Sequence, residues 1–282
     1  MQFTRLTPEQ KRQFDDEGYL IVRNALSSEE VAALTAAGDA LIGSSTSENR
    51  QPHPSGLYDS FRNCIAMDPT FLMLLQHPRT FPLIVELFGP NIHLITSHLI
   101  YKLPSPPGTA SDTALLGWHR DIAGTVHDLG HARIPRMEMK CAFYLTDMMQ
   151  PSTGVTLFAP GSNHLKEPLQ IPSGQSRPDG AVEPQLRAGD AVFFENRTFH
   201  AASVNLSGAT AKMVMMGYGF RWLMPLDYTE QPSHVVERVD DIGKQLLNGL
   251  RDPEGRFIPG GNNAPLREWC RQHSITYTAY DY

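Results

Sequence analysis

The chain has little cysteine and no long apolar run. Its three cysteines, Cys64, Cys141 and Cys270, are too widely spaced for the paired patterns of zinc sites or disulfide-rich domains. No 18 consecutive residues are apolar, and Met1 to Arg12 lacks the apolar stretch of a signal peptide. We therefore expect free thiols, a cytoplasmic location and no membrane partner.

Positive charge is also scarce. The formal net charge is -6, and no run of Lys or Arg could neutralise successive phosphates. This argues against nucleic acid as a partner and favours a small-molecule substrate. Hydrophobic residues nevertheless make up 41% of the chain and charged residues 19%, which is enough apolar material for a globular core.

The local patterns divide a single domain, residues 1–282, into three parts. Residues 1–91 are predicted to be mostly helical, 92–228 to form a β core, and 229–282 to hold one helix, about Val235 to Leu250, followed by loops. No internal repeat is visible.

Within the first part, capping residues mark two helices. Thr7 with Pro8 and Gln10 predicts a helix that stops near Gly18, and Ser27 predicts a second helix through Ala40. The remaining segments are read as a strand, a mobile loop and further helix, respectively Tyr19 to Val22, Gly43 to Ser60 and Pro69 to Phe88.

The β core is predicted from short apolar runs separated by Pro- and Gly-rich loops. This spacing is typical of a barrel or sandwich and not of repeating βαβ units. The runs are Ile92 to Leu103, Met137 to Leu145, Val155 to Ala159, Ala191 to Glu195 and Lys212 to Trp222.

The sharpest chemical signal is a His-x-Asp pair. On a strand, alternate side chains share a face, so His119 and Asp121 are expected to point to one interior. A third ligand opposite them would complete the two-His, one-carboxylate arrangement of non-haem iron(II) oxygenases. His200, at the end of an apolar strand, is the best candidate. A lone His-x-Asp pair among 11 histidines is more often accidental, but the strands and turns between these positions favour closure of a barrel that joins them.

At these positions the sequence resembles the phytanoyl-CoA dioxygenase family of 2-oxoglutarate-dependent iron oxygenases. The similarity extends from about Leu6 to Tyr228, and its fragments occur in the order typical of the family. They are Phe14 to Val22, Leu26 to Val31, Gly117 to Asp121, Ala142 to Asp147, Gly154, Pro160 to His164, Gly189 to Phe194, His200, Asn205 and Tyr218.

The resemblance implies a double-stranded β-helix, or jelly roll, of the cupin-like kind with flanking helices. It also implies iron(II) at His119, Asp121 and His200, with 2-oxoglutarate and O2 as cosubstrates that yield succinate and carbon dioxide. Relatives that halogenate generally lack the carboxylate ligand, so Asp121 favours hydroxylation or a related oxidation.

One position departs from the family pattern. Members usually bind the far carboxylate of 2-oxoglutarate with an Arg about eleven residues after the distal His, where this chain has Ala211. Lys212 is expected to face the other way unless a bulge shifts the register, so Lys140 is the preferred alternative. The family hydroxyl two residues after the distal His is also missing, with Ser203 next to that position.

Three explanations of Ala211 remain open: a relocated anchor, an engineered substitution, and loss of 2-oxoglutarate binding. Besides the oxygenase, we consider a metal-containing barrel without oxidative turnover, either isomerase-like or a binding module.

The loops containing His53, Tyr58 and Pro104 to Ala114 are candidate lids. Met137, Met139, Met213 and Met215 are read as core or pocket residues.

Overall fold

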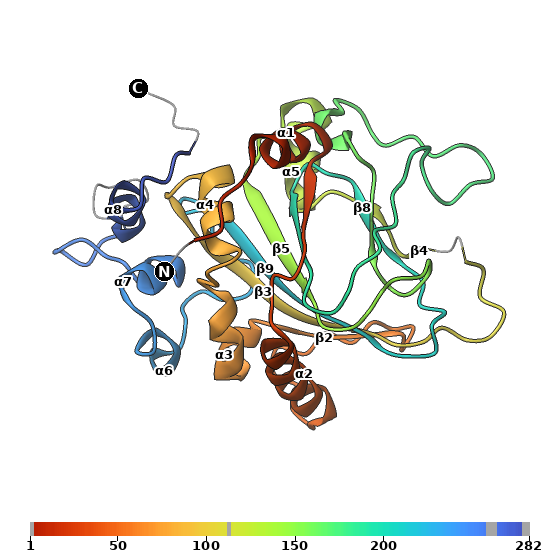
Figure 1. Ribbon diagram of the computed structural model, residues 1–282, viewed down its shortest axis with the longest axis horizontal. Coiled ribbons are helices and arrows are strands. Elements are labelled where there is room, and N and C mark those ends of the chain that lie inside the picture. The colour runs from red at the N-terminus through yellow and green to blue at the C-terminus, as the bar shows by residue number, and fades with distance from the viewer. Residues whose placement is uncertain (1–2, 112–113, 258–263, 278–282) are drawn as a thin grey trace.

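Two antiparallel sheets form the centre of the protein. The computed structural model describes residues 3–111, 114–257 and 264–277 (Figure 1). In these residues the larger sheet has six strands in the order β1-β7-β5-β9-β3-β2, and the smaller has the order β4-β8-β6. The strands are β1 (Tyr19–Val22), β2 (Tyr58–Arg62), β3 (Ile92–Lys102), β4 (Ala114–His119), β5 (Glu138–Tyr144), β6 (Thr156–Phe158), β7 (Ala191–Glu195), β8 (His200–Ser203) and β9 (Ala211–Phe220).

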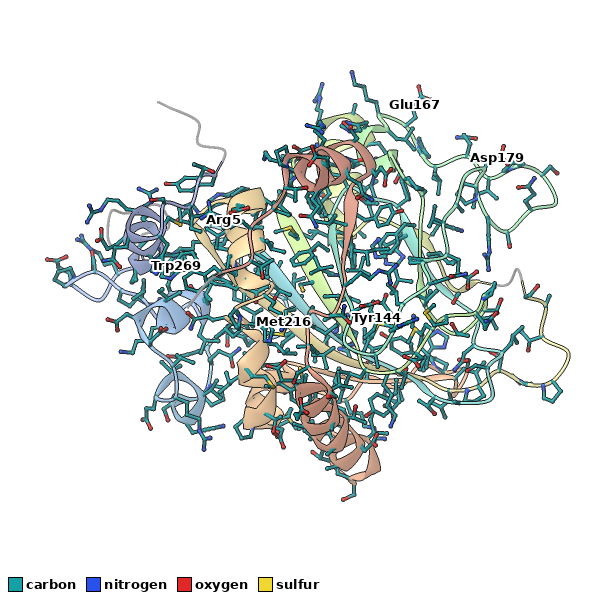
Figure 2. All side chains as sticks on the ribbon, in the orientation of Figure 1. Arg5, Tyr144, Glu167, Asp179, Met216 and Trp269 are labelled. Carbon is teal, nitrogen blue, oxygen red and sulfur yellow. The ribbon has the colours of Figure 1, made fainter. Side chains whose placement is uncertain are left out.

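The two faces of the larger sheet bury different apolar clusters. Helices cover one face, while the small sheet lies on the other side of it (Figure 1). Alternating side chains of β3 and β9 divide between the clusters: Leu99 and Val214 pack toward the helices, whereas Ile100 and Met213 pack toward the small sheet. Figure 2 shows how densely side chains fill both layers. The predicted mainly β architecture with flanking helices is confirmed.

The helices precede, cover and follow the sheets. Among the described residues, four α-helices precede β3, one short helix follows β4, and three follow β9. Their bounds are α1 (Pro8–Glu17), α2 (Ser28–Gly43), α3 (Cys64–Met67), α4 (Phe81–Phe88), α5 (Ala123–Leu129), α6 (Ser233–Val236), α7 (Asp241–Leu246) and α8 (Pro265–Gln272), with 3-10 turns at Pro69–Leu74, His131–Arg133 and Ser162–His164. Among the described helices, none has the length and apolar character needed to cross a bilayer.

The predicted helix starts are confirmed by their caps. Thr7 accepts a hydrogen bond from the Gln10 N–H while the Gln10 side chain accepts one from Thr7, and Ser27 and Glu30 repeat this arrangement at α2. Gly18 ends α1 with φ at 78°, as a left-handed cap.

Three local predictions are wrong. The last residues of the predicted loop, Tyr58 to Ser60, instead begin strand β2, because their backbone pairs with the far end of β3. The predicted helix over Pro69 to Phe88 is broken into a 3-10 turn and α4 around His77-Pro78, since Pro78 disfavours helical geometry at the preceding residue.

The tail helix is also interrupted. The single helix predicted over Val235 to Leu250 is two short ones, α6 and α7. Asp240 accepts a hydrogen bond from the Gly243 N–H and so caps a new helix, which competes with continuation of the first. Gly243 of α7 is closely packed, because a Cβ at this position would meet the Val239 side chain.

Gly18 is a position where an added methyl group should destabilise the fold. A Cβ at this left-handed residue would collide with Thr198 Oγ1 and the Asn163 side chain. We expect Gly18→Ala to lower the free energy of unfolding by about 2–4 kcal/mol, from backbone strain plus overpacking. Gly174 also has a positive φ but has nothing near its Cβ, so Gly174→Ala should lower it by only about 1–2 kcal/mol. Urea denaturation measures both, and equal losses would contradict the collision.

Candidate metal centre

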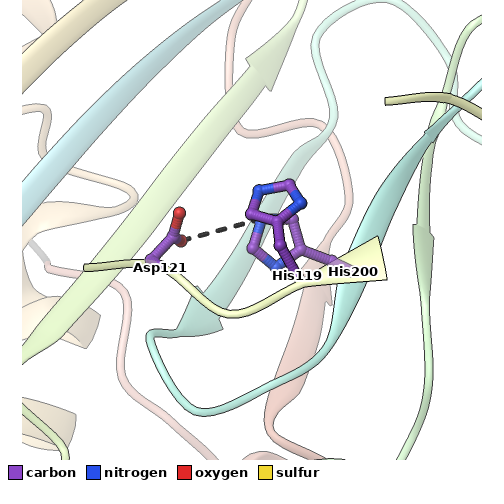
Figure 3. A group of neighbouring side chains, drawn as sticks. All are labelled: His119, Asp121 and His200. Atoms are coloured by element: carbon purple, nitrogen blue, oxygen red, sulfur yellow. Dashed lines mark ion pairs between the residues drawn. The ribbon is translucent and has the colours of Figure 1, made fainter. Parts of the chain in front are cut away.

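Three ligand-type side chains meet at the open end of the small sheet. His119 ends β4, His200 begins β8 opposite it, and Asp121 lies just past the end of β4. One donor atom from each lies within 4.8 Å of the others. Figure 3 shows the two imidazoles side by side with the carboxylate facing them. The strand geometry expected for the pair holds at His119 but ends before Asp121.

The hydrogen bonds of both histidines leave the Nε2 atoms as acceptors. His119 Nδ1 lies 2.8 Å from the Gly117 carbonyl, and His200 Nδ1 lies 3.0 Å from the Thr198 carbonyl. Because a carbonyl can only accept, each Nδ1 carries the proton. Each Nε2 then presents a lone pair, which is the form of imidazole that binds a metal.

Asp121 is held as an ionised carboxylate with one oxygen free. Burial alone would raise the pKa of this group, but the charges of Lys140 and His200 lower the pKa of Asp121 to about 2. Lys140 Nζ donates to Oδ1 at 2.7 Å. Oδ2 has no hydrogen-bond partner among the described residues and lies 3.7 Å from His200 Nε2, the pair joined by the dashed line in Figure 3.

Burial keeps His200 neutral. It lowers the pKa of this imidazole to about 4, although Asp121 acts in the opposite direction. Two neutral imidazoles and one carboxylate are the donor set that iron(II) takes in the facial arrangement of oxygenases. The unpartnered Asp121 Oδ2, buried beside the His200 lone pair, is an orphaned acceptor that a divalent cation would satisfy. The residues present therefore fit the metal.

Asn196 is a positioning residue that the sequence analysis missed. Its backbone carbonyl accepts from the Asp121 N–H, and its side-chain Oδ1 accepts from the N–H groups of Met137 and Glu138. It therefore fixes the Asp121 backbone to the start of β5. Ile122, the residue after Asp121, has φ at 52°, an uncommon conformation for a β-branched residue. This conformation turns the chain from Asp121 into α5.

A cavity of about 140 Å³ extends from the three ligand-type residues between the two sheets. Its wall includes Met213 and Met215, two of the four methionines read as pocket or core residues, whereas Met139 is in the helix-side cluster. Tyr58, from the predicted lid loop, also lines it. The full lining is Tyr58, Arg62, His98, Ile100, Lys102, His119, Asp121, Lys140, Thr156, His200, Ala201, Ala202, Met213 and Met215.

The residues predicted for cosubstrate binding occupy different places. Lys140 lines the cavity, but its ammonium is already paired with Asp121. Lys212 lies outside the cavity, with Nζ bonded to Asp39 of α2 at 2.6 Å. Ser203 is buried, does not line the cavity and has no hydrogen-bond partner for its Oγ among the described residues. Ala211 lies at the start of β9, opposite Lys102 of β3.

Three further histidines have other partners than the three ligand-type residues. His127 is exposed on α5, His131 contacts Arg120, and His164 contacts the Asp15 carbonyl. Arg120, which lies between His119 and Asp121 in the sequence, stacks over Phe199 with its guanidinium carbon 4.5 Å from the ring centre. It is buried and so packs the structure from behind the site.

Sequence comparison identifies the family. The chain matches the phytanoyl-CoA dioxygenase (PhyH) family over residues 14–213. It belongs to this family. The match spans the end of α1, helices α2 to α5, every strand from β1 to β8 and the first residues of β9. The ectoine dioxygenases of Bordetella parapertussis and Bordetella bronchiseptica are each 24% identical over 279 residues, with 87% of each chain covered.

Solved structures of similar fold support the jelly-roll prediction. The 2-oxoglutarate-dependent epimerase SnoN from nogalamycin biosynthesis has a TM-score of 0.60 at 22% identity, covering 76% of this chain and 80% of its own. HygX from Streptomyces hygroscopicus, solved with nickel, 2-oxoglutarate and hygromycin B bound, has a TM-score of 0.61 at 16% identity, covering 78% and 90%.

The family and the metal centre together define the enzyme class. The protein is a non-haem iron(II)- and 2-oxoglutarate-dependent dioxygenase, as the sequence predicted. The relatives include proteins described as a dioxygenase, an epimerase and a carbocyclase, so the fold alone does not select the outcome of the oxidation.

Proposed function

We propose that this protein hydroxylates a small, partly apolar metabolite, with iron(II) held by His119, Asp121 and His200. The observation that carries the proposal is the convergence of two free Nε2 atoms and one free carboxylate oxygen at one end of a cavity. Bound iron(II), with 2-oxoglutarate and O2, supplies the oxidising chemistry, and the protein's residues decide what is oriented toward it.

The presence of Asp121 favours hydroxylation as the outcome. A carboxylate at this position completes the three-ligand set, and it is the ligand that halogenating relatives generally lack. Lys140 holds Asp121 Oδ1, which leaves Oδ2 directed at His200 and thus at the metal position. The carboxylate is therefore fixed in the orientation that a one-oxygen ligand needs.

The size of the cavity supports a substrate that binds at its mouth. At about 140 Å³ it is below the roughly 300–1,000 Å³ of common ligand pockets, so it suits a molecule as small as 2-oxoglutarate. His119 is exposed, and the substrate is expected to approach from this side. Tyr58 and Met215 offer apolar surface and Arg62 offers a charged group, which together fit a partly apolar metabolite.

We also propose a cytoplasmic location. The three cysteines are free and buried, which is compatible with a reducing compartment.

Coupled turnover tests the proposal. Iron(II)-loaded protein given 2-oxoglutarate, O2 and a metabolite extract should release succinate in proportion to one product that has gained the mass of one oxygen atom. An extract without protein and protein without iron(II) are the controls. A metal-containing barrel without oxidative turnover, the second function considered, would retain its metal, consume no O2 and form no succinate, and that result would exclude the oxygenase.

A further inference from the structure

Lys102 is a buried cation with no anionic partner. It is the last residue of β3 and only 3% exposed, and its Nζ donates to the Gly154 carbonyl at 2.6 Å. Among the described residues no carboxylate lies within ion-pair distance of it. Burial lowers the pKa of this ammonium to about 7. An ammonium in this environment is costly unless an anion is supplied.

The lysine lies opposite Ala211, the position where the family's arginine is missing. In the β3–β9 pair, Lys102 faces Ala211 directly. A Cβ built on Gly154 would meet the Ala211 Cβ at 2.9 Å and the Lys102 Cδ at 3.5 Å, so the lysine stem runs beside the short alanine side chain. A cation therefore lies on the strand paired with the one that would carry the arginine, and it lines the same cavity as His119, Asp121 and His200.

The other cations near the cavity already have partners. Lys140 pairs with Asp121 at 2.7 Å, and Arg62 lies 3.8 Å from Asp227. Within the described part of the chain, this leaves Lys102 as the lining cation without a carboxylate. The Thr156 hydroxyl is on the same wall and can add a neutral hydrogen bond.

We propose that Lys102 Nζ binds the remote carboxylate of 2-oxoglutarate and replaces the arginine expected at position 211. This inference rests on the proposed function, because it assumes that the 2-oxo acid end of the molecule lies at the metal. It replaces Lys140, the anchor preferred from sequence, with a residue that sequence analysis did not consider.

A binding comparison with two 2-oxo acids isolates the remote carboxylate. Nickel(II)-loaded protein, which does not turn over, is titrated with 2-oxoglutarate and with 2-oxovalerate, which lacks that carboxylate. Loss of a hydrogen-bonded charge predicts that Lys102→Met binds 2-oxoglutarate roughly 10- to 100-fold more weakly, with 2-oxovalerate binding unchanged. Lys212→Met, a lysine paired with Asp39 outside the cavity, should bind both as the wild type does.

The titration separates two failures. Equal 2-oxoglutarate affinity in the wild type and Lys102→Met, or an equal loss for both acids, would overturn the role of Lys102 alone. No 2-oxoglutarate binding by the nickel-loaded wild type would overturn the proposed function as well. Nickel affinity and circular dichroism of Lys102→Met establish that it folds, and the double variant Lys102→Ala, Ala211→Arg should regain binding by returning the cation to β9.

Proton uptake gives a second readout. Since an anion favours the charged ammonium, 2-oxoglutarate binding at pH 8 should take up about one proton per molecule, and this uptake should vanish in Lys102→Met. The affinity of the wild type should accordingly fall as the pH rises above about 7. Calorimetry in buffers of different ionisation enthalpy measures the uptake, and an unchanged uptake in Lys102→Met would contradict the inference.

Discussion

His200→Ala is expected to abolish metal-dependent turnover and to give the largest loss of any single substitution in the protein. The variant removes one of two Nε2 donors and leaves Asp121 Oδ2 facing a void. A bound metal contributes several kcal/mol of transition-state stabilisation, so the loss in turnover should be on the order of 1,000-fold or more. Metal affinity, measured by titration with nickel(II) or iron(II) under anaerobic conditions, should fall in parallel.

The control is His127, a histidine that lies outside the site. His127 is exposed on α5 and contacts only the neighbouring Asp128 among the described residues, so His127→Ala should retain wild-type metal affinity and turnover. Retention of one tightly bound iron(II) by His200→Ala would show that these three residues do not form the centre.

The second large effect is expected for Lys140→Met, which should lower the free energy of unfolding of the protein. The substitution leaves the buried Asp121 carboxyl without its 2.7 Å partner, and the Glu138 carboxylate loses the nearby ammonium as well. Breaking a buried pair on one side typically lowers the free energy of unfolding by about 3–5 kcal/mol. Nickel(II) should restore part of this loss, because the cation takes over the compensation of Asp121.

Lys212→Met is the matched control. Both lysines are on central strands with ion-pair distances of 2.6–2.7 Å, but the Asp39 partner of Lys212 is half exposed, so the cost should stay below about 1 kcal/mol. Urea denaturation of the metal-free proteins compares the two. Similar small losses in both variants would mean that the Lys140–Asp121 pair does not stabilise the site.

The same pair predicts how acid affects stability. In the folded state the pKa of Asp121 is about 2, below its ordinary 3.8, so this carboxylate stabilises the fold above pH 4 and loses that contribution as the pH falls from about 4 to about 2. Lys140→Met should show less of this dependence in that window, since the ammonium is a cause of the lowered pKa.

The meeting of the three candidate metal ligands could be predicted from sequence, because the signals for them are residue types at short spacing or in a fixed order along the chain. His119 and Asp121 are two residues apart and end up on one side whether or not the strand continues between them. His200 follows an apolar strand that ends in a turn, and the similarity to a known family indicated that it belongs with His119 and Asp121. The helix starts at Thr7 and Ser27 are predictable from sequence for the same reason, because each cap is formed by two residues three positions apart.

The cosubstrate residues could not be predicted in the same way. Whether a lysine is free or paired depends on groups brought from other strands, as Lys140 illustrates with Asp121 and Lys212 with Asp39. The start of strand β2 could not be predicted for a related reason. The strand forms by pairing with β3, which is a long-range contact, and its own Tyr-Asp-Ser-Phe-Arg sequence has little β-strand character.

The amino-acid sequence by itself determined the family, the mainly β class and the three candidate metal ligands, since each depends on residue types at short or ordered spacings. Only the tertiary structure decided which cation that lines the cavity has no carboxylate partner among the described residues. Lys102 and Ala211 are adjacent solely through the register of β3 against β9. A shift of one residue in that register would turn every side chain of one strand to the other face, so the role of Lys102 exists only in the folded sheet.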